Sequence, residues 1–66
     1  MAYEITVNAW NGDYEHHFTY GEADRAKVDK DFVMLCQKYP LDEVALHDLD
    51  ESTTIKVRNK MVEVNP

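Results

Sequence analysis

Residues 3–20 read YEITVNAWNGDYEHHFTY, and this stretch decides the fold. From Tyr3 to Ala9, apolar and polar side chains alternate, which is typical of a strand with one buried face. Asn11-Gly12 follows, the strongest short signal for a β-hairpin. It predicts a two-residue type I′ turn in which both residues take a positive φ. The stretch therefore predicts two antiparallel strands joined by a tight turn.

The register of the hairpin follows by counting outward from this turn. It pairs Ala9 with Tyr14, Val7 with His16, Ile5 with Phe18, and Tyr3 with Tyr20. The alternation places these same residues on the buried side, so turn and burial pattern select one register. We expect the Ile5–Phe18 pair to be buried beneath a helix.

The start of that helix is indicated by Thr19 and Glu22, which have the spacing of a capping box, with Gly21 as an alternative cap. Glu22 and Asp24 would then lie in the first turn, at the positive end of the helix dipole, and Lys38 near the negative end. The charges therefore agree with the predicted direction of the helix.

The buried side of the helix is a single stripe at spacings of i, i+4, i+7, i+8 and i+11. We expect this stripe to pack on the apolar face of the hairpin. Pro40 disfavours helical geometry in the preceding residue, so the helix should end near there. The stripe comprises Val28, Phe32, Leu35, Cys36 and Tyr39.

Short strands are predicted for the C-terminal part. Residues 43–49 form a strand with Val44 and Leu46 facing inward, followed by a turn at 50–53. From residue 54 to 64 the alternation changes phase, because Ile55 and Val57 do not match Val62 and Val64. A turn at Asn59-Lys60, which pairs Lys56 with Glu63, and a bulge near Asn59 in one bent strand both explain this change.

We therefore expect an α+β fold, ββαββ or ββαβββ, in which one helix packs on a mainly antiparallel sheet. The chain has 66 residues, so we expect a single domain over residues 1–66. The other sheet face would carry Trp10, Thr6, His17, Lys56 and Glu63. That uncovered face, or an edge strand, would allow a homodimer with two-fold symmetry.

The composition disfavours several classes of function. Thirteen acidic and seven basic residues give a net charge of −6, which repels nucleic acids and anionic membranes and favours a partner with a basic surface. Cys36 is the single cysteine, so no internal disulfide can form. No secretion signal or long apolar stretch is evident, and we expect a cytoplasmic protein without a membrane anchor.

Candidate metal and catalytic residues are few. Adjacent residues on a strand point to opposite faces, so His16 and His17 cannot share an ion without a bulge. The oxygen pattern at residues 48–52 lacks the later ligands of a calcium loop. Cys36 lies on the apolar stripe, Ser52 has no evident base, and two glycines cannot build a phosphate loop. We expect no enzyme and no cofactor; the alternative is a metal-dependent module or enzyme using the histidines His16, His17 and His47 with nearby carboxylates.

Two surface features remain as candidates for partner binding. Trp10 falls on the polar face of the first strand beside the turn, and exposed aromatic residues are enriched in interfaces. Charge is unevenly spread between an acidic helix and a basic C-terminal cluster, which would orient a partner. The candidate partner-binding residues are Trp10, Asp29, Asp31, Lys56 and Arg58, with Lys60 completing the basic cluster.

We therefore expect a non-catalytic protein-binding module, an inhibitor or regulator that occupies the surface of a partner. An acidic domain can also mimic nucleic acid in a basic groove, if its carboxylates form a continuous ridge. In size and charge the chain resembles the small acidic proteins carried by phages and mobile elements.

Overall fold

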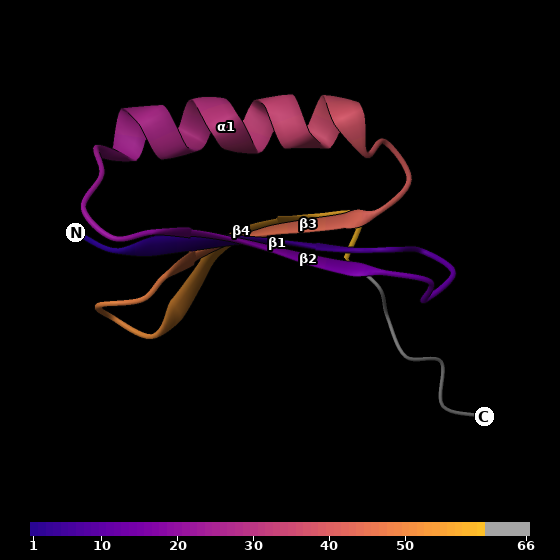
Figure 1. Cartoon of the computed structure of the whole chain (residues 1–66), viewed down its shortest axis with the longest axis horizontal. Helices are drawn as coiled ribbons and strands as arrows, with labels where there is room; N and C mark the ends of the chain where they lie inside the picture. The colour runs from indigo at the N-terminus through magenta and orange to yellow at the C-terminus, as the bar shows by residue number, and fades with distance from the viewer. Residues whose placement is uncertain (61–66) are drawn as a thin grey trace.

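The computed structural model describes residues 1–60. Its elements are β1 (Tyr3–Asn8), β2 (Glu15–Tyr20), α1 (Arg25–Lys38), β3 (Glu43–Asp48) and β4 (Thr53–Arg58). The strands form one sheet in the order β2-β1-β3-β4, and each neighbouring pair is antiparallel. The helix lies across one face of this sheet (Figure 1). This is the predicted α+β fold, in its ββαββ form.

The register of the first hairpin is confirmed, but its turn is not the predicted one. Tyr3 pairs with Tyr20, and the backbone N–H of Ala9 donates to the carbonyl of Tyr14 at 3.0 Å. The loop has four residues, and the Gly12 N–H donates to the Ala9 carbonyl at 3.0 Å. Only Gly12 takes a positive φ, 81°, and Asn11 does not. A four-residue loop between Ala9 and Tyr14 and a two-residue loop at Asn11-Gly12 leave the same residues opposite each other. The predicted register is therefore correct although the predicted turn type is wrong.

The helix starts later than the sequence predicts. Thr19 lies in β2, where its hydroxyl donates to Glu4 Oε2 at 3.3 Å, so it cannot cap the helix. Glu22 instead accepts from the N-terminal amine at 3.0 Å. Asp24 occupies the N-cap without a side-chain cap bond, and no acidic residue lies in the first turn. The capping box is therefore wrong, whereas the helix end at Lys38 is confirmed.

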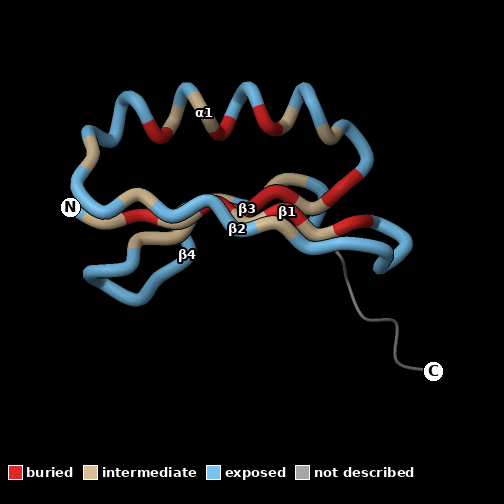
Figure 2. The backbone as a smooth tube through the Cα atoms, in the orientation of Figure 1, coloured by how far each residue is buried: buried red, intermediate tan, exposed pale blue. Residues whose placement is uncertain are grey.

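The core lies between α1 and the two central strands. The buried turns of the helix are those nearest the sheet (Figure 2), and they pack with alternate residues of β1 and β3. Val28, Phe32 and Leu35 are buried as predicted, and Cys36 and Tyr39 are partly buried beside them. The sheet side of the core consists of Tyr3, Ile5, Val7, Val44 and Leu46.

The second strand is less covered than expected. Ile5 is fully buried, but its partner Phe18 is 36% exposed, so burial of the whole pair is only half correct. The reason is topological. Because β3 joins the sheet beside β1, β2 is left at the edge, and α1 packs against β3 rather than over β2.

The pairing of the last strand, β4, with β3 contains a register shift that the sequence pattern did not predict. The register of β3 and β4 shifts between Leu46 and His47, and Ile55 is the residue left without a partner. Beyond this shift, Lys56 pairs with Leu46 and therefore lies on the helix side, not on the open face as predicted. Val57 lies on the open face and is 37% exposed. The expected common phase of Ile55 and Val57 is wrong for the same reason.

Beyond β4, Asn59 has a φ of 56°. The pairings predicted for Val62, Glu63 and Val64 lie outside the described residues. The choice between a turn at Asn59-Lys60 and a bulge therefore stays a prediction.

Candidate partner-binding surface

The tip of the first hairpin and the end of α1 lie at the same end of the molecule (Figure 1). Asp42 joins them. It is 3% exposed, and its carboxylate accepts a hydrogen bond from the backbone N–H of Trp10 at 3.0 Å and another from the Tyr14 hydroxyl. A buried carboxylate needs such donors, because burial without them is costly. The hairpin tip is therefore tied to the loop that follows the helix.

Arg58 holds the same loop from the other side. Its guanidinium donates to the backbone carbonyls of Cys36 and Tyr39, and to that of Asp42 at 3.2 Å. Asn59 adds a bond from Nδ2 to the Pro40 carbonyl at 2.9 Å. A cation is stabilising here, because the C-terminal end of a helix carries partial negative charge. The loop is thus fixed by both neighbouring elements.

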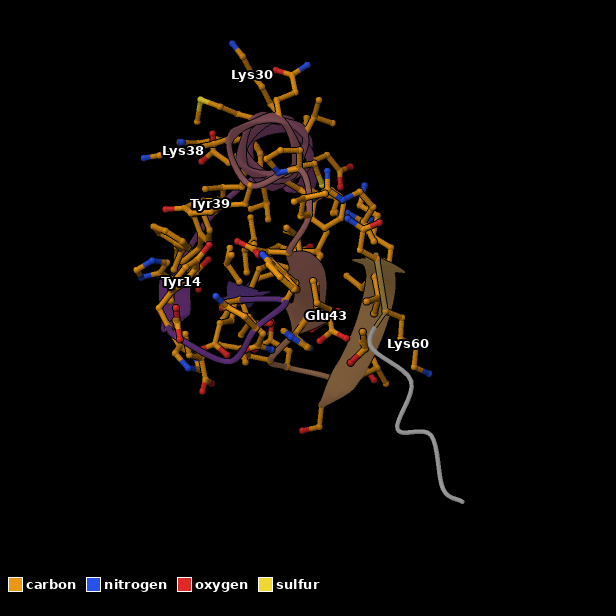
Figure 3. The ribbon with its side chains drawn as sticks, turned by 90° about the vertical axis from the view of Figure 1, so that its right-hand side faces the viewer. Tyr14, Lys30, Lys38, Tyr39, Glu43 and Lys60 are labelled. Atoms are coloured by element: carbon orange, nitrogen blue, oxygen red, sulfur yellow. The ribbon has the colours of Figure 1, made fainter. Side chains whose placement is uncertain are left out.

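On this frame sits a group of exposed and partly buried apolar side chains, which we call the aromatic end. Trp10 is 64% exposed, Leu41 68% and Tyr14 40%. They surround a hollow of about 170 Å³. Figure 3 shows Tyr14 and Tyr39 on the same side of the molecule, and their ring centroids are 6.1 Å apart. The aromatic end comprises Trp10, Tyr14, Tyr39, Pro40 and Leu41.

Two polar groups at the aromatic end are the phenol of Tyr14, which stays protonated, and the ammonium group of Lys38. The hydrogen bond to Asp42 raises the pKa of Tyr14 to about 12, because the ionised phenol would lose its bond to the carboxylate. Tyr14 is therefore a neutral donor at physiological pH. The ammonium group of Lys38 lies 5.6 Å from the centre of the Tyr39 ring, a cation–π distance. The ammonium group of Lys38 thus lies beside the rings of the aromatic end.

Trp10 is the only predicted partner-binding residue that belongs to the aromatic end. It lies in the turn rather than on the polar face of the strand, because β1 ends at Asn8. Its indole is exposed as expected. Its backbone is anchored by Asp42, which the sequence pattern did not reveal.

The acidic residues predicted to bind a partner are engaged within the protein. Asp29 lies 2.9 Å from Arg25 and 3.1 Å from Lys56, and Asp31 accepts from Tyr20 at 2.8 Å and from Lys27 at 3.0 Å. The bond from Arg25 lowers the pKa of Asp29, and the bond from Tyr20 lowers that of Asp31. Lys56 also lies 4.7 Å from the centre of the Phe32 ring, and Arg58 holds the helix end. Their roles toward a partner stay predictions.

The three histidines do not converge. His16 lies on the helix side of β2, His17 and His47 on the open face. His17 is 2.6 Å from Glu15 and 3.6 Å from Glu4, and chiefly the bond to Glu15 raises its pKa. Both ring nitrogens of His47 are hydrogen-bonded, to Thr6 at 2.9 Å and Thr54 at 3.0 Å. Within residues 1–60, no group of three or more potential ligands is placed to hold a metal.

The residues of the calcium-like pattern form a turn. Asp48 Oδ1 accepts from the backbone N–H groups of Asp50 and Glu51, at 3.0 and 3.1 Å. Asp50 accepts from the Ala2 N–H at 3.0 Å and so holds the start of β1. Ser52 takes a φ of 54° in the same turn. These oxygens stabilise the chain reversal between β3 and β4.

The sequence pattern did not reveal Tyr14 and Leu41 as surface residues. The alternation assigns Tyr14 to the core face, but its side chain is 40% exposed, whereas Tyr39 packs partly buried against the core as the stripe predicts. One signal was available: Leu41 follows Pro40 in a loop, where no regular element can bury it.

No known protein family matches the chain, and no curated protein or solved structure matches it. The helix in the described part of the chain is not long and apolar enough to cross a membrane.

Proposed function

We propose that this protein is a non-catalytic binding module that occupies the surface of a partner protein through its aromatic end. The observation that carries the proposal is the exposure of Trp10, Tyr14 and Leu41 side by side on a fixed frame. Binding energy in interfaces is concentrated in a few large residues, with tryptophan and tyrosine prominent among them. Their backbone is already ordered here, so little conformational entropy is lost on binding.

The partner is a protein with a basic surface. The net charge of −6 accelerates encounter with positive surfaces and disfavours acidic ones. Along the helix, Asp29 and Asp31 pair with neighbouring cations, so the described residues show no continuous carboxylate ridge there. We therefore favour occupation of a protein surface over mimicry of nucleic acid. As a separate proposal, we place the protein in the cytoplasm.

Substitution of Trp10 by alanine tests this function. The Trp10 contact to Asp42 is made by the backbone N–H, which alanine retains, so the fold should persist. We expect an unchanged circular dichroism spectrum and melting temperature. Loss of the indole should weaken partner binding by at least about 2 kcal/mol, or roughly thirtyfold in Kd. The partner is isolated with the wild-type protein, and Kd is then measured by calorimetry.

Val33→Ala is the matched control, because Val33 is 52% exposed on the helix, away from the aromatic end. Binding should be unaffected by this change. Equal Kd values for the wild-type protein and Trp10→Ala would contradict the proposal. So would a Trp10→Ala protein that melts at a much lower temperature, since the side chain would then belong to the core.

A further inference from the structure

The two edges of the sheet differ in how they are built. Natural edge strands are usually protected from pairing by lysines, prolines or bulges. The edge strand β4 carries Lys56, Arg58 and the irregularity at Ile55. The other edge strand, β2, has the sequence EHHFTY, which contains no lysine and no proline, and its pairing with β1 is regular. Of the two edge strands within residues 1–60, β2 is therefore the one that lacks these protections.

The backbone groups on the outer side of β2 can be identified from the ladder. The Ala9–Tyr14 bond fixes which residues of β2 bond to β1: Tyr14 and every second residue after it. The residues between them direct their N–H and C=O groups away from β1. Within residues 1–60, β1 is the only neighbour of β2, so these groups form an unoccupied row. The row comprises Glu15, His17 and Thr19.

The side chains beside this edge define two different surfaces. On the helix side lie His16 and Phe18, and the 36% exposure of Phe18 leaves an apolar floor that α1 does not cover. On the open side lie Glu15, whose side chain is 59% exposed, and Glu4 in the adjacent strand, which also contact His17 at 2.6 and 3.6 Å. An added strand would therefore meet apolar surface on one face and carboxylates on the other.

We propose that the outer edge of β2 accepts an extended segment of a basic protein as a fifth strand of the sheet. In strand addition, backbone hydrogen bonds supply affinity and alternate side chains supply specificity. The segment that fits has apolar residues facing Phe18 and lysine or arginine facing Glu15. The proposal rests on the proposed function, because it states how the partner is held.

Charge decides between this occupant and a second copy of the chain. A second β2 would bring another Glu15 and a second net charge of −6 to the same edge. A basic segment is instead attracted by the carboxylates of Glu15 and Glu4. Pairing of six-residue strands alone also falls far short of the roughly 20–30 residues a side of a stable interface. The edge therefore fits a segment of a partner that is also held elsewhere, at the aromatic end.

The probe is an acetylated seven-residue peptide of alternating lysine and valine, compared with one of alternating glutamate and valine. Amide hydrogen exchange of the protein is followed by NMR during titration. We expect the lysine peptide to slow exchange at Glu15, His17 and Thr19 at least threefold, and the glutamate peptide to have no effect. Absence of any change at these three amides at millimolar lysine peptide overturns the proposal.

His17→Pro removes one outward donor without touching the ladder to β1, a position where an edge strand tolerates proline. It should bind the lysine peptide at least fivefold more weakly than His17→Ala, which keeps the N–H and equally lacks the imidazole contacts to Glu15 and Glu4. Equal binding by both variants overturns the proposal, as does protection of these amides that grows with protein concentration alone.

Trp10→Ala should bind the peptide normally, so failure of the strand-addition proposal is distinguishable from failure of the proposed function. The affinity for the peptide tests the role of the β2 edge, and the affinity of Trp10→Ala for the partner tests the role of the aromatic end.

Discussion

Arg58 supports the aromatic end without being part of its surface. Its forked guanidinium reaches three backbone carbonyls, of Cys36, Tyr39 and Asp42, around the last turn of α1 and the loop after it. A helix leaves its last carbonyls without internal partners, and a cation with several donors can satisfy more than one of them. The position of the Tyr39 backbone therefore depends on a residue that the sequence pattern assigned to partner binding.

Replacement of Arg58 by methionine should destabilise the protein by about 1.5–3 kcal/mol, the typical loss for hydrogen bonds to a charged group. Arg58→Lys should recover only part of this loss, because an ammonium group cannot reproduce the planar fork. Urea denaturation followed by circular dichroism measures both variants. Equal stability of the wild-type protein and Arg58→Met would show that these hydrogen bonds contribute nothing net.

At the scale of elements, the first hairpin shows why a register can be predicted when a turn cannot. The alternation from Tyr3 to Ala9 and the glycine at residue 12 are both local, and they restrict the pairing to one parity. The structure places Trp10 and Asn11 at the centre of the turn and gives the positive φ to Gly12 alone. Gly12 is thus required by backbone geometry, in a different turn from the predicted one.

Gly12→Ala should lower stability by about 1–2 kcal/mol, the cost of holding a residue with a Cβ in the left-handed region. A Cβ at Gly12 would meet no atom within 4 Å, so this cost is purely conformational. Gly21→Ala is the control, because a Cβ there also meets nothing and Gly21 has no positive φ. It should leave stability unchanged or raise it by up to about 1 kcal/mol. Equal effects of the two changes in thermal melts would contradict the assigned turn.

The other elements were predictable to the extent that their signals were local. The stripe of α1 and the inward residues Val44 and Leu46 follow from periodicity and are confirmed. The irregularity at Ile55 arises from pairing with β3, so the sequence of β4 alone does not contain it. The exposure of Phe18 depends on strand order in the sheet. The aromatic end was missed for the same kind of reason, since two segments far apart in the sequence, the hairpin tip and residues 39–41, form it.

At the scale of the whole molecule, two phenol–carboxylate bonds connect β2 and the residue before it to α1 and to the loop between α1 and β3. Tyr20 donates to Asp31 on α1 at 2.8 Å, and Tyr14 donates to Asp42 just beyond the helix. These bonds lie at opposite ends of β2, the edge strand on which Phe18 is 36% exposed. They therefore supply part of the attachment that burial does not provide for β2.

Alkaline pH should loosen this attachment. The pKa of Tyr20 is raised to about 12, chiefly by burial and then by its bond to Asp31, and that of Tyr14 to about 12 by its bond to Asp42. The folded state thus holds both protons more tightly than the unfolded state, whose tyrosines ionise near pH 10. Their contribution to stability is complete below about pH 10 and is lost as the pH rises toward about 12.

The test is the melting temperature between pH 8 and about 12, compared between the wild-type protein and the double variant Tyr14→Phe, Tyr20→Phe. The double variant should melt lower at pH 8, because it lacks both hydrogen bonds, and its melting temperature should fall less steeply above about pH 10. All other ionisable groups are common to both proteins, so the difference between the two curves isolates these phenols. Parallel curves above about pH 10 would show that the two bonds do not link β2 to the helix layer, and that Tyr14 is positioned at the aromatic end by ring packing alone.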